Sequence, residues 1–158
     1  MKKILFKREP EEVSLIYCEN ISNLFDSVST DINCCVIADK KVLDKHDSLR
    51  EQIESKNFII YEISNPEEEK NIESYNTIIN FLSSKSLRRN DLIIGLGGGA
   101  LTDLAGFVSS TYMRGLNYIQ IPTSLLAQVD ASIGGKTAIN YKKIKNFIGT
   151  FYNPSKII

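Results

Sequence analysis

Apolar segments of strand length alternate with longer polar stretches of helical period, and this alternation restricts the folds available to the chain more than any other feature. The pattern is typical of β-α-β units, in which helices pack on a parallel sheet. The expected strands are residues 13–17, 34–38, 58–63, 91–96 and 118–121, and the expected helices are residues 21–28, 41–55, 66–84, 100–112 and 125–133. We therefore predict one α/β domain over residues 1–158, with a Rossmann-like parallel sheet and flanking helices.

The third expected helix has the clearest local signals. Asn65 can cap it, Pro66 suits its first turn, and the acidic residues 67–69 complement the positive end of its dipole. Its inward stripe is expected to consist of Ile72, Tyr75, Ile78, Ile79 and Leu82. Residues 154–158 indicate the beginning of a further element, so we expect the chain to be a truncated part of a longer protein.

Composition argues against several classes of function. The 19 basic and 19 acidic residues balance, which disfavours binding to nucleic acid or to an anionic membrane surface. The chain starts with a short basic stretch, and no apolar run is long enough for a signal peptide or a membrane span. Cys18, Cys34 and Cys35 lack metal-type spacing, so we expect buried free thiols and a cytoplasmic protein. The single histidine, His46, is expected on an exposed helix surface.

A strand-to-helix turn rich in glycine is the strongest candidate for a binding site. The expected strand at residues 91–96 runs into three glycines at positions 97–99, and a helical pattern begins at Ala100. Glycines let a ligand approach the backbone, and the helix start offers free N–H groups, which favours a phosphate or pyrophosphate site over a simple tight turn. The spacing also fits a short dinucleotide fingerprint. Because Gln120 stands where an acidic residue is expected, an ordinary Rossmann dehydrogenase is not predicted.

Residues 130–137 are similar to the end of a phosphate-binding P-loop. Asp130 occupies the place of the required first glycine, and its carboxylate would repel a triphosphate. The segment also follows helix-like sequence instead of a strand. We therefore reject nucleoside triphosphate hydrolysis, while Lys136 remains a candidate for holding a single phosphate.

Polar residues gather among small and apolar neighbours in the second half of the chain. They are Asp103, Arg114, Asp130, Lys136, Lys145 and Asn146. Taken singly, Arg114 and Lys145 fit a solvated surface, and Asp130 fits a turn cap. Asn146 fits an ordinary loop. Their grouping near glycine turns favours a binding function.

Four segments, residues 97–107, 112–115, 120–140 and 145–152, together resemble the 3-dehydroquinate synthase family. Upstream, the likeness is restricted to Asp39 and to the Glu67-x-x-Lys70 pair. The resemblance implies an N-terminal α/β domain that holds NAD and a C-terminal helical domain that supplies a divalent metal, zinc or cobalt. Such an enzyme converts a phosphorylated keto acid of the shikimate pathway, 3-deoxy-D-arabino-heptulosonate 7-phosphate, to 3-dehydroquinate with loss of phosphate, and it regenerates NAD in each cycle. A homodimer is implied for the complete enzyme.

The resemblance also implies roles for individual residues. Asp39, Glu67 and Lys70 would contact the adenosine side of NAD, and Gly97, Gly98, Gly99 and Ala100 its pyrophosphate. Its remaining polar groups would contact Asp103, Thr123, Ser124 and Lys145. Asp130, Lys136 and Asn146 would hold substrate, and Arg114 would reach the substrate phosphate across a dimer interface. The metal ligands and the main proton-transfer residues would lie beyond Ile158.

General chemistry agrees with the implied substrate residues. A carboxylate such as Asp130 can accept hydrogen bonds from sugar hydroxyls and so fix a carbinol against the nicotinamide. Lys136 and Arg114 supply positive charge for a phosphate that binds and then leaves. For Glu67 and Lys70, an i,i+3 charge pair at a helix start is an equally open interpretation.

The sequence differs from the family pattern at Pro66, Thr102 and Ser124, of which Ser124 keeps a hydroxyl. Three alternatives stay open. One is another sugar phosphate cyclase, and a second is an iron-dependent or glycerol-type dehydrogenase, against which residues 129–136 argue. The third is a nucleotide-binding module without catalysis.

Overall fold

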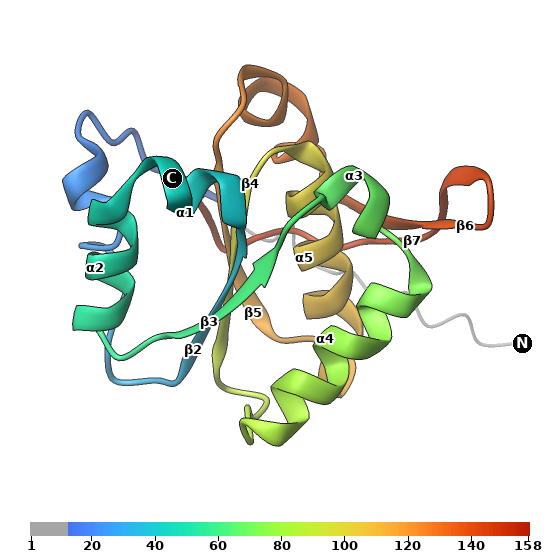
Figure 1. The fold of residues 1–158 in the computed structure, drawn as a ribbon, viewed down its shortest axis with the longest axis horizontal. Coiled ribbons are helices and arrows are strands. Elements are labelled where there is room, and N and C mark those ends of the chain that lie inside the picture. The colour runs from blue at the N-terminus through green and yellow to red at the C-terminus, as the bar shows by residue number, and fades with distance from the viewer. Residues whose placement is uncertain (1–12) are drawn as a thin grey trace, which may run out of the picture.

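The computed structural model describes residues 13–158 (Figure 1). Its strands are β1 (Ser14–Leu15), β2 (Cys34–Asp39), β3 (Ile59–Ile63), β4 (Leu92–Gly97), β5 (Asn117–Pro122), β6 (Lys136–Tyr141), β7 (Ile144–Phe151) and β8 (Lys156–Ile157). Its α-helices are α1 (Lys40–Lys45), α2 (Asp47–Ser55), α3 (Pro66–Glu69), α4 (Ile72–Ser84) and α5 (Gly99–Thr111). Short 3₁₀ turns lie at η1 (Ile21–Asn23) and η2 (Tyr112–Arg114), and a π-helical segment lies at η3 (Ala127–Ala131).

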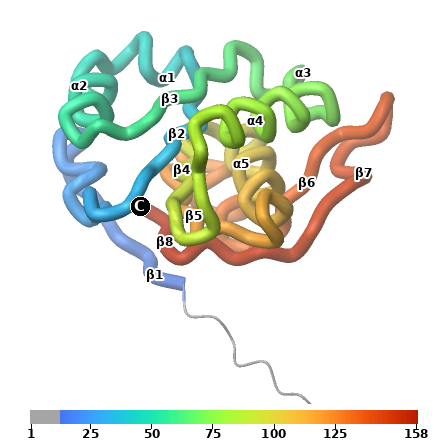
Figure 2. The backbone as a smooth tube through the Cα atoms, turned by 90° about the horizontal axis from the view of Figure 1, so that it is seen from below, coloured from blue at the N-terminus to red at the C-terminus, as the bar shows by residue number. Residues whose placement is uncertain are grey.

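A parallel sheet forms the centre of the molecule, with strand order β1-β8-β5-β4-β2-β3 (Figure 2). Successive side chains of its strands point to opposite faces. Val36 and Ile94 therefore belong to one core with residues of α1 and α2, whereas Ile37 and Ile93 belong to a second core with residues of α4 and α5. The predicted Rossmann-like sheet with flanking helices is confirmed.

An antiparallel hairpin, β6–β7, packs on α5 and extends beyond it (Figure 1). The absence of a side chain at Gly106 permits the contact, because a Cβ there would lie 2.4 Å from Thr137 Cγ2. The hydroxyl oxygens of Thr137 and Thr150 lie 2.8 Å apart, and Thr150 donates to Ser110 Oγ at 2.8 Å. These contacts tie the base of the hairpin to the helix.

The prediction of a helix at residues 21–28 is wrong. The segment forms only η1 and successive turns, such as the bond from Val28 N–H to Phe25 O at 3.0 Å. The side chain of Asn20 accepts the N–H of Ser22 at 3.0 Å and closes a local turn there. Such side-chain bonds offer the backbone an alternative to helical ones.

The helix expected at residues 41–55 is divided at His46, whose backbone (φ −138°, ψ 78°) leaves the helical region. His46 is exposed, as predicted, but it lies between two helices instead of on the surface of one. The strand expected at residues 13–17 is also shorter and comprises β1 only.

The helix expected at residues 66–84 is divided into α3 and α4. The side chain of Asn65 makes no capping bond, and the Glu69 carboxylate instead accepts the N–H groups of Ser64 and Asn65 at 3.0 and 2.7 Å. A second cap, Asn71, accepts the N–H of Ser74 at 2.9 Å and starts α4. The inward stripe is confirmed, with two residues buried and three packed against the same core: Ile78 and Leu82, and Ile72, Tyr75 and Ile79.

The remaining expectations have mixed outcomes. The element expected at residues 154–158 is confirmed as β8, whereas the β6–β7 hairpin was not expected. Cys34 and Cys35 are buried, and burial raises the pKa of both thiols, while Cys18 is only half-buried. Within residues 13–158, no helix has the length and apolar character needed to cross a membrane. The prediction about a signal peptide concerns residues 1–12 and lies outside the described part.

Candidate functional site

The carboxyl ends of β2 and β4 lie side by side where the chain changes from one face of the sheet to the other. β2 leads into α1 on one face, and β4 leads into α5 on the opposite face. Asp39 and Gly97 meet at this point, since a Cβ at Gly97 would lie 3.2 Å from Asp39 Cβ. In open α/β sheets, ligands bind in the crevice at such a switch point.

The glycine turn between β4 and α5 borders this crevice. Gly97 is packed closely, because a Cβ there would lie 3.0 Å from Leu101 Cβ. Gly98 is open, and the nearest atom to an added Cβ would be Ser124 Oγ at 3.7 Å. No side chain caps α5, and the first N–H groups of a helix, here those of Gly99 and Ala100, have no acceptor within it. The turn therefore fits a pyrophosphate or a similar anion.

Asp39 combines a structural role with its place in the crevice. It is half-buried, and its Oδ1 accepts the N–H of Lys41 at 2.9 Å, which caps α1. The second carboxylate oxygen is chemically able to accept from a ligand hydroxyl.

A polar cluster lies beside α5. Lys70 is only 5% exposed, and its ammonium pairs with the Asp103 carboxylate and donates to Asn146 Oδ1 at 2.6 Å. Burial raises the pKa of Asp103, against the lowering effect of the hydrogen bond and charge of Lys70, and the charges of Glu67 and Asp130 raise this pKa further. The structure thus brings Lys70, Glu67 and Asp130 within electrostatic reach of Asp103, and it brings Asn146 to Lys70.

The chain after β5 passes close to the glycine turn. Thr123 N–H donates to Gly97 O at 2.9 Å, which continues the β4–β5 ladder. Ser124 Oγ accepts the N–H of Ala127 at 3.4 Å where the helical segment begins. Ala131 Cβ lies 3.4 Å from the place of a Cβ on Gly99. Thr123 and Ser124 are therefore beside the turn.

Three of the predicted basic residues lie outside this cluster. Lys136 and Lys145 are exposed on the hairpin, at the start of β6 and within β7. Arg114 is exposed in η2 at the other end of α5, about 20 Å from the glycine turn by the rise of a 13-residue helix. The structure does not bring Arg114 to the other predicted residues of this chain. Lys136 also opens a strand after a helical segment, which is the reverse of the order in a P-loop.

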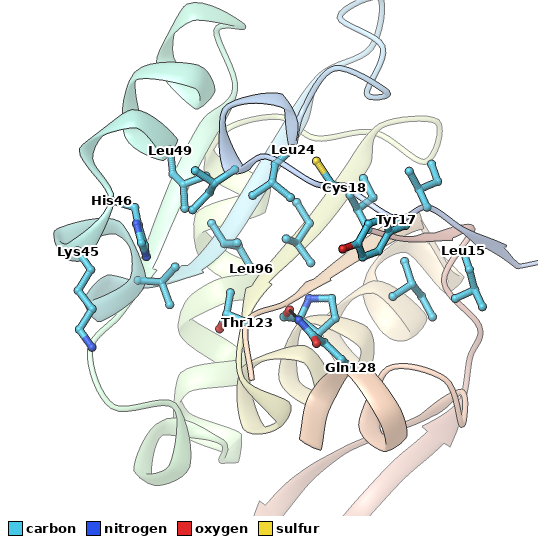
Figure 3. Close-up of a pocket in the computed structure, with 17 residues that line it drawn as sticks. Leu15, Tyr17, Cys18, Leu24, Lys45, His46, Leu49, Leu96, Thr123 and Gln128 are labelled. Atoms are coloured by element: carbon cyan, nitrogen blue, oxygen red, sulfur yellow. Dashed lines mark hydrogen bonds between the residues drawn. The ribbon is translucent and has the colours of Figure 1, made fainter. Parts of the chain in front are cut away.

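A cavity of about 660 Å³ opens on the α1–α2 side of the same sheet edge (Figure 3). Leu24, Leu49 and Leu96 provide apolar walls, and Thr123 and Gln128 are among its polar residues. Sequence reasoning missed this cavity, because distant segments of the chain assemble it. Its walls suit an aromatic or aliphatic part of a ligand.

The family model described as 3-dehydroquinate synthase N-terminal matches residues 60–158. This chain belongs to the 3-dehydroquinate synthase family. The 3-dehydroquinate synthase of Pelagibacter ubique is 39% identical over an aligned length of 163 residues. The match covers 99% of this chain and 44% of the relative. The bifunctional 3-dehydroquinate synthase/phosphatase of Fusobacterium nucleatum is 43% identical over 140 residues, which cover 87% of this chain and 21% of the relative. The chain therefore spans less than half the length of these curated relatives.

A solved structure has the same fold. The 2-epi-5-epi-valiolone synthase of Streptomyces hygroscopicus, with NAD+ and Zn2+ bound, superposes with a TM-score of 0.81 at 23% identity. The match covers 99% of this chain and 44% of that chain.

In this member of the 3-dehydroquinate synthase family, two polar residues lie next to the predicted site residues and were not predicted from the sequence. Asn71 followed by Ser74 had a local helix-capping signal. Asn140 had none, because its partners are distant: its N–H donates to Lys70 O at 2.8 Å, and its Oδ1 accepts the N–H of Asn146 at 2.9 Å.

Proposed function

We propose that this chain provides the NAD-binding part of a 3-dehydroquinate synthase of the shikimate pathway. The observation that carries the proposal is the uncapped Gly98 turn at the switch point between β2 and β4, which suits a dinucleotide pyrophosphate. The name of the Pelagibacter relative supports the activity, and the NAD+ in the valiolone synthase structure supports the cofactor.

The cofactor would extend to both sides of the glycine turn. Its pyrophosphate would contact Gly97, Gly98, Gly99 and Ala100, its adenosine Asp39, Glu67 and Lys70, and its other polar groups Asp103, Thr123, Ser124 and Lys145. Bound NAD supplies reversible acceptance of a hydride. The Lys70–Asp103 pair is held by contacts within the chain, so its charges need little reorganisation when the cofactor binds.

The substrate would be a phosphorylated keto acid, 3-deoxy-D-arabino-heptulosonate 7-phosphate. Asp130 would accept hydrogen bonds from its hydroxyls and fix the carbinol for oxidation. Lys136 would pair with its phosphate, and Asn146 would supply a neutral contact. Because Arg114 lies at the far end of α5, it would serve the site of the other protomer in a homodimer.

The residues that the structure describes do not fit the divalent metal of the proposed enzyme. Within residues 13–158, no group of three His, Cys, Asp or Glu side chains is placed to hold a metal ion. We expect zinc or cobalt only where a second domain is present, and we derive no step through the metal. The free thiols agree with a cytoplasmic enzyme.

Titration calorimetry with NAD+ and with ATP tests the proposal on the chain itself. We expect weak binding of NAD+ and no hydrolysis of ATP, because the chain has the glycine turn but no complete P-loop. Tight ATP binding with turnover would contradict it. Titration of the phosphorylated keto acid onto the NAD-loaded chain separates the synthase from a non-catalytic module, which would bind NAD+ alone.

A further inference from the structure

A local irregularity in the hairpin surrounds Asn140. β6 and β7 pair regularly up to Ile139 and Ile148, and they pair again at Tyr141 and Ile144, so that residues 145–147 lie opposite Asn140 alone. In such a bulge, the strand ladder does not bond every backbone group of the longer strand. Asn146 lies within the bulge and has a φ of 53°, a left-handed conformation that is uncommon for residues other than glycine.

Asn140 supplies bonds that the ladder lacks. Its Oδ1 accepts the N–H of Asn146 at 2.9 Å, and its own N–H donates to Lys70 O at 2.8 Å. One residue thus holds the backbone of both Lys70 and Asn146, which come from distant parts of the sequence. The side chains of those two residues then meet, with Lys70 Nζ 2.6 Å from Asn146 Oδ1.

The consequence concerns the buried ammonium of Lys70. Its partners are the carboxylate of Asp103 and the amide oxygen of Asn146. Asparagine tolerates the left-handed region better than most residues, but the conformation still costs free energy, which the bond to Asn140 offsets. Without the Asn140 amide, Asn146 would relax toward ordinary strand geometry, and Lys70 would lose a fixed neutral partner.

We propose that Asn140 is a positioning residue, which holds Asn146 in its left-handed conformation and thereby fixes the Lys70 ammonium against Asp103 before a ligand binds. Its effect on NAD(H) rests on the function proposed above. Its effect on Asn146 does not, because both hydrogen bonds exist in the chain alone.

The test compares Asn140→Ala and Asn140→Asp, because aspartate keeps an acceptor oxygen at the same position. The first readout is hydrogen exchange of the Asn146 amide, and the second is NADH affinity by fluorescence titration. We expect Asn140→Ala to speed exchange and to weaken NADH binding by about three- to tenfold, the range for loss of one net hydrogen bond. Asn140→Asp should restore slow exchange and most of the NADH affinity. If Asn140→Ala does not fold, Asn140→Ser provides the short side chain, since its hydroxyl does not span the gap.

Thr150→Val is the matched control. It removes a hydroxyl bond to Ser110 from the same hairpin, so it should lower thermal stability without changing the Asn146 amide or the NADH affinity. Unchanged exchange of the Asn146 amide in Asn140→Ala would overturn the inference. So would fast exchange with wild-type NADH affinity. A wild-type chain that does not bind NADH would refute the proposed function, and the amide exchange would then decide the positioning role alone.

Discussion

Neighbouring glycines in the turn between β4 and α5 have different physical roles. Gly97 has no room for a side chain, because Leu101 Cβ and Asp39 Cβ lie 3.0 and 3.2 Å from the place of its missing Cβ. Gly98 has room, and its φ of −73° is accessible to any residue. The contribution of Gly98 is therefore bare backbone at the crevice, and it is not needed for the fold.

Gly98→Ala should leave the fold intact and weaken dinucleotide binding. We expect the free energy of unfolding to fall by only about 0.5–1 kcal/mol, because alanine is a poorer N-cap residue than glycine. NADH affinity should fall about tenfold or more, because a methyl group blocks the approach to the helix N–H groups. Calorimetry and thermal denaturation measure the two effects. Gly134→Ala, which has its nearest atom at 3.8 Å, is the control glycine outside the turn. Wild-type NADH affinity in Gly98→Ala would exclude the turn as the binding site.

The raised pKa of Asp103 predicts a pH dependence of stability. Between the ordinary aspartate pKa and the raised value, the folded chain binds a proton that the unfolded chain lacks. Asp103 therefore adds to the free energy of unfolding at low pH. Its contribution is complete below the ordinary aspartate pKa, and it is lost as the pH rises through the raised pKa of the folded chain. Urea denaturation from about pH 3 to about pH 8 measures the free energy of unfolding of wild type and Asp103→Asn. The difference between the two free energies should change with pH in this window. Parallel curves would contradict the assignment.

Local sequence signals predicted the helices and strands whose limits depend on neighbouring residues in the sequence. The strand and helix around the glycine turn agree with expectation within one or two residues, because strand, glycines and helix follow without interruption. The division between α3 and α4 had one local signal, the cap that Asn71 provides for Ser74, and one distant cause. Lys70 leaves the helical path to meet Asp103 and Asn146, which lie 33 and 76 residues later, and neither contact is visible in a local pattern.

The hairpin had a signal that the sequence interpretation did not use. Thr137 and Ile139 alternate with more exposed neighbours, as do Ile148 and Thr150, which is the period of a strand. No strand is predicted for these residues, and only Asn146 between them is interpreted as a loop residue. For the site, the family likeness predicted residues that gather at one sheet edge and on the hairpin beside it, but no sequence pattern showed that Arg114 lies at the opposite end of α5.

Gly106→Ala should destabilise the contact between α5 and the hairpin. The new Cβ would lie 2.4 Å from Thr137 Cγ2 and 3.2 Å from the Tyr118 hydroxyl oxygen. We expect a loss of about 1–3 kcal/mol in the free energy of unfolding, the usual range for overpacking. Thr137→Ser removes Cγ2 and keeps the hydroxyl, so the double variant should recover much of the loss in urea denaturation. Failure of this rescue would mean that another contact limits the position.

Across the whole molecule, large apolar side chains remain exposed on the segment after β5 and on the hairpin. They are Leu125, Leu126, Val129, Ile133, Phe147 and Phe151. In the first of these segments the buried residues are the small Ala127 and Ser132, the reverse of an ordinary surface helix. The site therefore has uncovered apolar neighbours, which agrees with the weak affinity for NAD(H) that we expect of this chain.

The positions of the side chains that could bind a metal also predict that the chain holds no stoichiometric zinc or cobalt. Within residues 13–158, the single histidine, His46, is exposed between α1 and α2, and no group of three suitable side chains gathers anywhere. Tight zinc sites use three or four such ligands. Elemental analysis after chelation and dialysis should find well below one metal per chain. One retained metal per chain would refute this prediction.

The pairing of β1 with β8 joins residues from both ends of the described chain, with Ser14 opposite Lys156 and Leu15 opposite Ile157. During synthesis on the ribosome, β2 to β5 can assemble with α5 before β8 emerges. β8 then adds to β5, and only this step gives β1 a partner. Closing so long a loop costs more entropy than pairing near neighbours. Of the described strands, β1 is synthesised first and is thus paired last. Pulse-labelled hydrogen exchange during refolding should find the amide of Ile16, bonded to Ile157 O at 2.8 Å, protected later than those of β4.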